Sequence, residues 1–575
     1  MNWSSDERYF FYLAERKPAK TKSFFDQKPS KPDDGVVPGN EYKYVEDWGE
    51  QLTGYSKTVL AVFDVEEQNI KLVTFDGGED RNITKVIPDT QNPNVLYMVL
   101  HHTDPFRLGL IYCTQRRSDL VRIEGWKDET PKITAMSKKD DDIAILDATI
   151  SPKGDRLVWL QCPEGGPHNR AFEMWSCSVN DAENTRTKII STSSMPLFFE
   201  SQLVFQNECW LNECTIAFQC VTKSRVFVRT VDIDKSMVSE INATSPSNPN
   251  ASHFLLHARQ GDLLILETSF SMGPTVIFAK KSGDNSFNFT RSNPFISDSK
   301  FLMSEIECQL ISTSFEKYDM EYFLAYPKNV ENGKKVPLVV IPHGGPHSVF
   351  VSTFLDNCAG MVLCGYAVIL VNYPGSLGFD SCNDLPGKVG VLDVQSCQQA
   401  AVEALAKFND KLDKENVSVF GGSHGGFLAL RLIADYPDFY KACITRNPVC
   451  DFAQMVGISD IPDWVFVECG LQPSLHGLEI IHDITKAEVL AKFNEQSPAR
   501  FCDKVKCPVM MMVGSNDRRV PMSQGLNYCR MLKQSRPEVP VEIFQYEDNH
   551  SLNTVKVHSD VFVNAILWLE KFRKY

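Results

Sequence analysis

The sequence predicts an all-β region followed by a region built on a doubly wound, mostly parallel sheet. Short strand-like segments separated by polar turn clusters fill residues 1–305, without a long helical pattern among them. From residue 306 to residue 575, strand-like and helix-like segments alternate, which is typical of a parallel sheet covered by helices. We therefore expect two domains, 1–305 and 306–575.

The strands of the first region are predicted from short apolar runs bounded by turn residues. They include 9–14, 59–64, 95–100, 157–160, 215–221, 225–231, 263–267 and 275–279. A polar turn leading into an apolar strand recurs at 3–8, at 150–155 and, more loosely, at 210–213. Repeats of this kind favour four-stranded propeller blades over a sandwich or a barrel, so we predict a β-propeller.

The second region is predicted to alternate strands and helices along its whole length. The expected strands are 320–326, 338–341, 366–372, 417–420, 508–513 and 541–545, and the expected helices are 354–363, 391–408, 426–434, 524–533 and 555–572. The last helix carries an apolar stripe formed by Val557, Val561, Ala565, Leu569 and Phe572. This stripe is predicted to pack against the sheet.

Composition limits the classes of function. The 575-residue chain is 43% hydrophobic and 23% charged, as in ordinary globular proteins, and its net charge of −14 argues against nucleic-acid and membrane partners. Its apolar runs are strand-sized, well short of the ~20 residues that a membrane span needs, and its polar N-terminus does not resemble a signal peptide. The 17 cysteines lack C-x-x-C pairs, which predicts reduced thiols, a cytoplasmic location and no zinc site.

The segment V-S-V-F-G-G-S-H-G-G-F at 417–427 joins a strand to a helix through a glycine-rich turn. It fits G-x-S-x-G, the nucleophile elbow of α/β-hydrolases, in which side chains at 421 and 425 would clash with the strand or the helix. The turn exposes the hydroxyl of Ser423 at the positive end of the helix. A lone G-x-S-x-G is more often an ordinary turn, so the assignment depends on partner residues.

A catalytic serine needs a general base and an acid that orients the base, which follow the serine in the order acid, histidine in this fold. Asp517 lies just past the carboxyl end of a predicted strand, and His550 lies in the next strand-to-helix loop. Asp503 precedes its strand, and Asp548 shares the loop of the histidine, so we prefer Asp517 as the acid. The predicted catalytic triad is Ser423, Asp517 and His550.

The motif H-G-G-P-H at 343–347 follows the strand 338–341, where an oxyanion loop is expected. The backbone N–H of His424, next to Ser423, is one predicted donor to the oxyanion. The second is the N–H of Gly345, with Gly344 as the alternative. Each donor is worth about 3 kcal/mol in the transition state.

The adjacent residues His101 and His102 suggest a metal pair, but neighbours on a strand point to opposite faces, so we predict a structural or surface role.

These residues resemble the prolyl oligopeptidase family of serine peptidases and, within it, the acylaminoacyl-peptidase (acylpeptide hydrolase) subfamily. The resemblance is dense in the second region, at H-G-G-P-H 343–347, G-G-S-H-G-G-F 421–427, R-N-P-V 446–449, S-D-I-P-D-W 459–464 and D-R-R-V-P 517–521. It is looser in the first region, at W-S-x-D-E 3–7, E-D-W-G-E 46–50 and D-P-F-R-L-G 104–109.

The resemblance implies a β-propeller that caps an α/β-hydrolase domain, the same triad, a cytosolic location, homo-oligomers and no cofactor. It also implies that Arg519 and Trp464 line the substrate pocket, whereas their ordinary roles would be a surface charge and a packed aromatic ring.

Two departures from the subfamily stand out. Relatives carry additional N-terminal sequence, so we expect a propeller with fewer blades or a shortened form of the protein. Pro374 replaces an arginine of the relatives, and we expect this change to loosen the loop or to alter the rim of the pocket.

The leading hypothesis is a serine exopeptidase that removes an N-acylated amino acid from short peptides through an acyl-enzyme on Ser423. An oligopeptidase, dipeptidyl peptidase or esterase with the same triad is the alternative. The pairs Glu66-Glu67 and Glu46-Asp47 are similar to the acidic pair with which dipeptidyl peptidases hold a free amino terminus, although solvated turn charges are commoner. A third hypothesis is a weakly active subunit or interaction scaffold.

Overall fold

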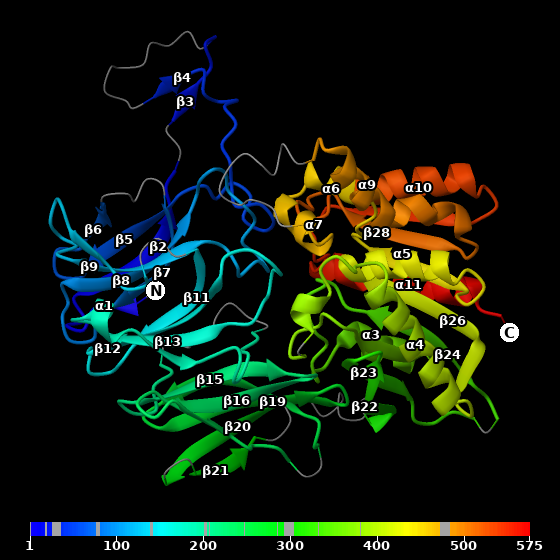
Figure 1. Cartoon of the computed structure of the whole chain (residues 1–575), viewed down its shortest axis with the longest axis horizontal. Helices are drawn as coiled ribbons and strands as arrows, with labels where there is room; N and C mark the ends of the chain where they lie inside the picture. The colour runs from blue at the N-terminus through cyan, green and yellow to red at the C-terminus, as the bar shows by residue number, and fades with distance from the viewer. Residues whose placement is uncertain are drawn as a thin grey trace.

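In the computed structural model of the chain, two domains lie side by side (Figure 1). The N-terminal domain, blue to green, consists almost entirely of strands, whereas the C-terminal domain, green to red, combines strands with helices. The structure describes residues 2–17, 20–25, 36–75, 81–138, 142–199, 204–205, 208–245, 248–283, 286–292, 304–331, 333–379, 381–471 and 484–574.

Five antiparallel sheets follow one another along the described part of the N-terminal domain. They are β1 (Asn2–Trp3), β2 (Tyr9–Glu15), β5 (Thr58–Asp64) and β6 (Asn69–Val73); β7 (Arg81–Pro88), β8 (Val95–His102), β9 (Ser118–Glu124) and β10 (Lys132–Ala135); β11 (Ile143–Ile150), β12 (Arg156–Pro163), β13 (Glu173–Ser178) and β14 (Thr187–Ile190); β15 (Thr215–Thr222), β16 (Arg225–Asp232) and β17 (Met237–Glu240); and β18 (Ser252–Arg259), β19 (Asp262–Ser269), β20 (Met272–Gly283) and β21 (Ser286–Arg291). A short helix, α1 (Ala182–Thr185), precedes β14, and a small pair, β3 (Thr21–Lys22) and β4 (Val37–Pro38), projects from the first sheet (Figure 1).

Consecutive sheets of the N-terminal domain share clusters of buried apolar side chains. Phe11 of the first sheet packs in one cluster with Leu96 of the second, and Tyr97 of the second packs in another with Trp159 of the third. Phe218 of the fourth sheet joins the third sheet, and a further cluster joins the fourth and fifth sheets. Antiparallel sheets stacked in succession form the blades of a β-propeller, so the predicted architecture is confirmed.

The repeated turn that suggested blades has the same hydrogen bond at its first two occurrences. The N–H of Ser4 donates to the carbonyl of Tyr9 at 2.8 Å, and the N–H of Ser151 donates to the carbonyl of Arg156 at 2.9 Å. Both turns lead from the first strand of a sheet into the second. The weak sequence repeat therefore marks an equivalent position in two blades.

The C-terminal domain contains one eight-stranded sheet with the order β22-β23-β25-β24-β26-β27-β28-β29. Its strands are β22 (Ile306–Phe315), β23 (Tyr318–Pro327), β24 (Val336–Pro342), β25 (Ala367–Asn372), β26 (Leu412–Gly422), β27 (Ala442–Arg446), β28 (Val509–Gly514) and β29 (Val541–Tyr546). The first three strands in this order pair antiparallel, and all others pair parallel. This is the predicted α/β-hydrolase sheet, and its carboxyl edge collects the loops that follow the parallel strands.

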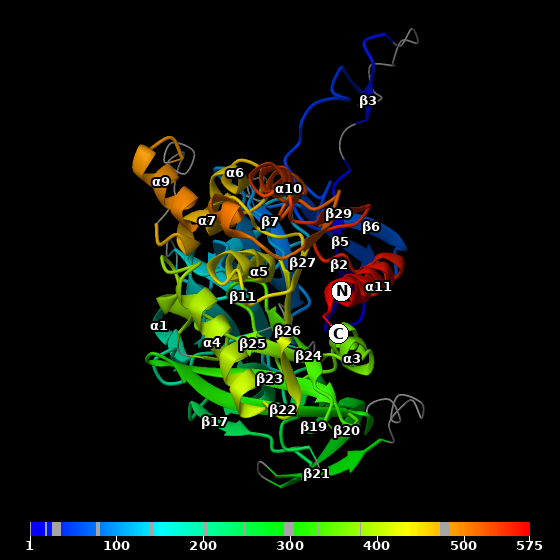
Figure 2. The same cartoon turned by 90° about the vertical axis from the view of Figure 1, so that its right-hand side faces the viewer.

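Helices cover both faces of this sheet, as Figure 2 shows for α4 and α5 on one face and α3 and α11 on the other. The helical elements are α3 (Asp356–Leu363), η2 (Cys382–Asp384), α4 (Leu392–Lys407), α5 (His424–Asp435), α6 (Phe452–Val456), α7 (Pro462–Glu468), α9 (Ala487–Gln496), η3 (Pro498–Lys504), α10 (Ser523–Ser535) and α11 (Val555–Phe572). The predicted stripe of the last helix packs on the sheet, with Val561, Ala565 and Leu569 buried and Val557 and Phe572 partly buried.

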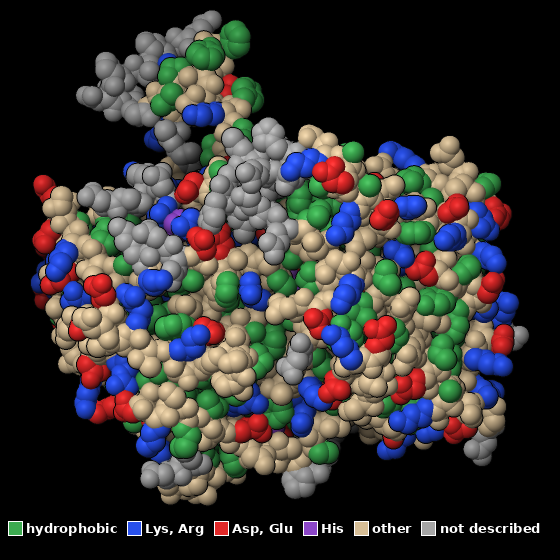
Figure 3. Space-filling view, viewed as in Figure 1, with side chains coloured by type: hydrophobic (Ala, Val, Ile, Leu, Met, Phe, Trp, Pro, Cys, Tyr) green, Lys and Arg blue, Asp and Glu red, His purple; other side chains and the backbone are tan. Residues whose placement is uncertain are grey.

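Charges of both signs are interspersed over the face of the molecule drawn in Figure 3, on both domains. Within the described ranges, none of the helices combines the length and the apolar character that a membrane span requires.

Candidate active site

Ser423 occupies a strained turn between β26 and α5. Its φ of 57° and ψ of −122° lie in a region of backbone conformation that residues other than glycine rarely adopt. A Cβ on Gly421 would lie 2.0 Å from the carbonyl oxygen of Gly425, and a Cβ on Gly425 would lie 2.4 Å from that of Pro342. Backbone atoms approach so closely on both sides that the two predicted glycines are required by the turn itself.

The loop after β28 and the loop after β29 bring Asp517 and His550 together. The Nδ1 of His550 lies 2.6 Å from the Oδ2 of Asp517. The Asp517 side chain is buried, and its Oδ1 accepts the backbone N–H of Val520 at 2.7 Å. The carboxylate of Asp548 instead binds Thr554, and Asp503 lies in η3 at an exposed position. Of the three candidate acids, the structure places Asp517 on the histidine.

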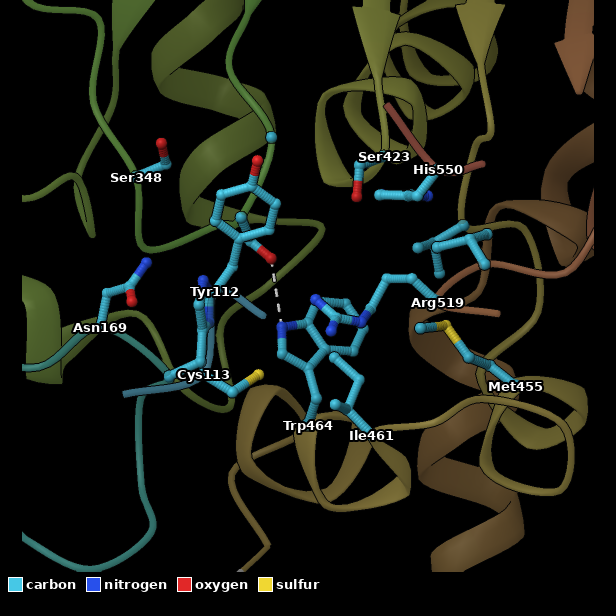
Figure 4. A pocket seen from close by; sticks show the side chains of 15 residues that line it. Tyr112, Cys113, Asn169, Ser348, Ser423, Met455, Ile461, Trp464, Arg519 and His550 are labelled. Carbon is cyan, nitrogen blue, oxygen red and sulfur yellow. Dashed lines mark hydrogen bonds between the residues drawn. The ribbon is translucent and has the colours of Figure 1, made fainter. Parts of the chain in front are cut away.

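The hydroxyl of Ser423 lies beside the ring of His550, and both side chains line one cavity (Figure 4). Among the described residues, no hydrogen bond joins the Ser423 hydroxyl to the His550 ring. Such bonds are often long in enzymes without substrate and tighten when substrate binds.

A glycine loop lies against the serine. Gly344 approaches so closely that a Cβ on it would lie 3.2 Å from the carbonyl oxygen of Gly422, and Gly345 has a φ of 118°. His343 supports this loop: its Nδ1 donates to the carbonyl of Gly344 at 2.7 Å. Burial lowers the pKa of His343 to about 3, so its ring is neutral at pH 7.

The cavity that Ser423 and His550 line has a volume of about 220 Å³ and is walled by both domains. The C-terminal domain contributes the apolar side chains of Val449, Met455, Ile461, Trp464 and Val520, and the propeller contributes Tyr112, Cys113, His168 and Asn169. The indole N–H of Trp464 donates to the carbonyl of Gly345 at 3.1 Å, the dashed line in Figure 4.

Arg519 also lines this cavity and is held from both domains. Its guanidinium binds the carboxylate of Asp460 at 2.8 and 3.1 Å and the carbonyl of Ile111, on the propeller, at 2.7 Å. Burial opposes the charge of Arg519, but the Asp460 carboxylate outweighs it and raises the pKa of the guanidinium. Both residues that the resemblance placed in the pocket, Arg519 and Trp464, therefore lie there.

Two further residues hold the site, although no sequence pattern pointed to either of them. The carboxylate of Glu50, on the propeller, accepts the backbone N–H of Arg518 and that of His550, each at 2.9 Å. Asn447 donates to the carbonyl of His550 at 2.8 Å and accepts the N–H of Gly514 at 2.7 Å. Both residues fall within motifs quoted above, E-D-W-G-E and R-N-P-V, but neither motif indicates a partner.

The histidine pair and the glutamate pair that the sequence analysis singled out lie outside the cavity. His102 binds Asp119 at 2.9 Å, and Glu66 pairs with Arg8 at 2.6 Å. Glu67 binds Lys71 at 3.1 Å.

One group of side chains in the described residues is close enough to hold a metal ion, namely Cys214, Asp232 and Asp234. It lies on the fourth sheet, and Asp232 already binds Lys235 at 2.9 Å.

Pro374 is buried in the loop after β25.

Comparisons with known proteins point to one family. The profile described as acylamino-acid-releasing enzyme, N-terminal domain, matches residues 1–301, and that of the prolyl oligopeptidase family matches 353–574. The acylamino-acid-releasing enzyme of Mus musculus is 33% identical over 99% of this chain and 78% of its own length. That of Arabidopsis thaliana is 29% identical over 100% of this chain and 80% of its own length.

Solved structures show the same fold at low sequence identity. A Pyrococcus horikoshii acylaminoacyl peptidase has a TM-score of 0.73 and 17% identity over 100% of this chain and 81% of its own. An acylaminoacyl peptidase in complex with Z-Gly-Gly-Phe-chloromethyl ketone has a TM-score of 0.58 and 16% identity over 90% and 86%. By profile and by sequence identity, this chain belongs to the acylamino-acid-releasing enzymes of the prolyl oligopeptidase family of serine peptidases.

Proposed function

We propose that this protein is a serine exopeptidase that releases the N-acylated first residue of short peptides. One observation carries the proposal: Ser423 lies on a strained elbow beside the His550–Asp517 pair, at the wall of an apolar cavity. Asp517 orients His550, and His550 serves as general base and then as general acid.

The reaction proceeds through an acyl-enzyme. The Oγ of Ser423 attacks the carbonyl carbon of the acylated residue while His550 accepts the hydroxyl proton, and the resulting oxyanion accepts N–H groups of Gly345 and His424. Among the described residues, neither N–H is bonded to an acceptor. His550 then protonates the departing amine and the C–N bond breaks. Water next attacks the ester carbon while His550 accepts its proton, and His550 returns this proton to the Oγ of Ser423 as the N-acyl amino acid leaves.

The charges at the cavity favour a blocked amino terminus. No carboxylate lines the cavity in the described residues, and its one formally charged side chain is the cation Arg519. Because Arg519 is already paired with Asp460, a free terminal ammonium would find no unpaired counter-charge on this wall, whereas a neutral acyl-amide needs none. The same observation disfavours a dipeptidyl peptidase, and the pair Glu66-Glu67 is engaged elsewhere.

The proposal extends to organisation and location. The domain boundary falls near residue 305, between β21 and β22, close to residues 293–303, which lie outside the described residues. All 17 cysteine thiols are free, which supports a cytoplasmic location. Homo-oligomers are proposed from the family resemblance alone.

Hydrolysis of N-acetyl-alanyl p-nitroanilide and of unblocked alanyl p-nitroanilide tests the proposal, with wild type and Ser423→Ala. We expect the wild type to cleave the blocked compound at least tenfold faster, and Ser423→Ala to lose at least a thousandfold in kcat. Equal cleavage of both compounds would favour a broader peptidase or esterase. Cleavage of neither, together with no labelling of Ser423 by a fluorophosphonate, would favour an inactive scaffold.

A further inference from the structure

A second cavity, of about 450 Å³, meets the first at the reacting groups. The two cavities share Gly344, Ser348, Ser423 and His550 and otherwise have different walls. The second is lined by apolar side chains, among them Phe350, Leu355 and Phe420, and by one arginine, Arg446. Because the first cavity suits the acylated residue, the second is available to the part of the peptide that leaves.

Arg446 is adjacent to the nucleophile in the fold. It ends β27 opposite Gly422 on β26, and its carbonyl oxygen accepts the N–H of Ser423 at 2.8 Å. Its guanidinium lies over the ring of Phe420, 5.5 Å from the centroid. The backbone of Arg446 thus supports the elbow while its side chain faces the second cavity.

The guanidinium of Arg446 has no anionic partner among the described residues. Its Nε is shielded from solvent without a hydrogen bond, and this burial lowers the pKa of the group. The one carboxylate on the cavity wall, Asp356, binds His558 at 2.9 Å instead. An arginine left in this way costs folding free energy, which is typical of a group kept for a ligand.

Among the described residues, the three arginines that are buried as whole residues are each paired with a carboxylate. Arg116 binds Asp463 at 2.7 Å, Arg519 binds Asp460 at 2.8 Å, and Arg431 binds Asp435 at 3.0 Å. Arg446 is only partly buried as a residue, but its Nε is shielded from solvent and no carboxylate among the described residues pairs with it.

We propose that Arg446 binds the C-terminal carboxylate of the leaving peptide. The assignment rests on the proposed peptidase function and adds a preference for peptides with a free carboxylate. A planar guanidinium can bind a carboxylate through two parallel hydrogen bonds. Because each extended residue adds about 3.5 Å, the carboxylate comes close to Ser423 when one or two residues leave. The enzyme's net charge of −14 repels anions, so an acid preference requires a local cation.

The test compares N-acetyl-alanyl-alanine with N-acetyl-alanyl-alaninamide by kcat/KM. We expect the wild type to prefer the acid by about tenfold, and Arg446→Met to bring the ratio of acid to amide close to one. Arg446→Lys keeps the charge without the planar fork and should retain part of the preference. Arg530→Met, which removes an exposed arginine on α10, is the matched control and should retain the full ratio.

Two further measurements keep the test decisive. Thermal unfolding should show that Arg446→Met is at least as stable as the wild type, because a buried cation is removed, whereas a structural role predicts lower stability. With wild type alone, alanyl-alanine should inhibit p-nitroanilide hydrolysis at about tenfold lower concentration than alanyl-alaninamide.

A wild-type ratio near one, or a full ratio in Arg446→Met, would overturn the assignment. Failure of the proposed function looks different, because the acetylated p-nitroanilide, which has no carboxylate, would not be cleaved either.

Discussion

At the scale of single residues, the site depends on groups that act on the backbone of the catalytic loops. Glu50 is buried and joins two loops by accepting N–H groups next to Asp517 and at His550. Its own N–H donates to Asp460, the partner of Arg519. A propeller carboxylate thereby helps to position both the acid and the base of the proposed triad.

Glu50→Gln should lower kcat about tenfold to hundredfold, with a smaller effect on KM. The NH₂ group of glutamine would face the backbone N–H of either Arg518 or His550, so one of these two hydrogen bonds would be lost. A lost hydrogen bond to a charged group costs about 1.5–3 kcal/mol. Steady-state kinetics with the acetylated p-nitroanilide measures this effect. Glu66→Gln, at an exposed carboxylate of the same domain, is the control. An unchanged kcat in Glu50→Gln would exclude a positioning role.

The neutral ring of His343 makes stability depend on pH. Burial lowers its pKa to about 3, whereas an unfolded chain has the ordinary value of about 6.5. As the pH falls below about 6.5, His343 binds a proton in the unfolded state but stays neutral in the folded state. The free energy of unfolding therefore decreases progressively between pH 6.5 and pH 3.

Between pH 7.5 and pH 5, we expect His343 to account for a loss of about 2 kcal/mol in the free energy of unfolding. Denaturant unfolding at the two pH values, with wild type and His343→Asn, measures it. The variant should lose less stability on acidification, and equal losses would contradict the prediction.

At the scale of elements, the elbow depends on backbone contacts that no side chain can relieve. Gly425→Ala should abolish activity and lower the melting temperature, because its Cβ would meet the carbonyl oxygen of Pro342 at 2.4 Å. Gly457→Ala is the control, since the nearest atom to its Cβ is the carbonyl oxygen of Gln454 at 3.8 Å. Assays and thermal melts of both variants test the prediction, which an active Gly425→Ala would contradict.

Most long elements could be predicted from periodicity, but several short ones could not. The predicted strand 417–420 lies within β26, and the predicted helix 555–572 coincides with α11. By contrast, β27 (Ala442–Arg446) and α7 (Pro462–Glu468) were not predicted. Both are short and largely buried. The strand therefore lacks the alternation of apolar and polar residues that marks a half-buried strand, and the helix lacks a polar face opposite an apolar one.

At the scale of the whole molecule, the two domains are joined by buried polar contacts. Arg116 of the propeller binds Asp463 of α7 at 2.7 Å, and the two side chains are 8% and 2% exposed. The N–H of Gly109 donates to the carbonyl of Asp460 at 2.8 Å in the same region. The propeller is therefore held against the elements that wall the cavity.

Breaking one partner of this ion pair should destabilise the molecule by about 3 kcal/mol, because the other charge remains buried. We expect Arg116→Met to lower the melting temperature more than the double variant Arg116→Met/Asp463→Leu does, since the latter removes both charges. Scanning calorimetry measures both, with Lys571→Met at an exposed pair as the control. A double variant less stable than Arg116→Met would exclude this account.

The amino-acid sequence alone sets the order of Ser423, Asp517 and His550 and the place of the oxyanion loop, because each follows a recognisable strand. It also determined the glycines of the elbow, since a sharp strand-to-helix turn excludes side chains there. By contrast, the folded structure was needed to show which propeller groups reach the site and that Arg446 has no anionic partner among the described residues. Glu50 and His550 are 500 residues apart, and a contact over that distance has no local pattern from which to predict it. The absence of a partner likewise depends on where every other charge in the fold lies.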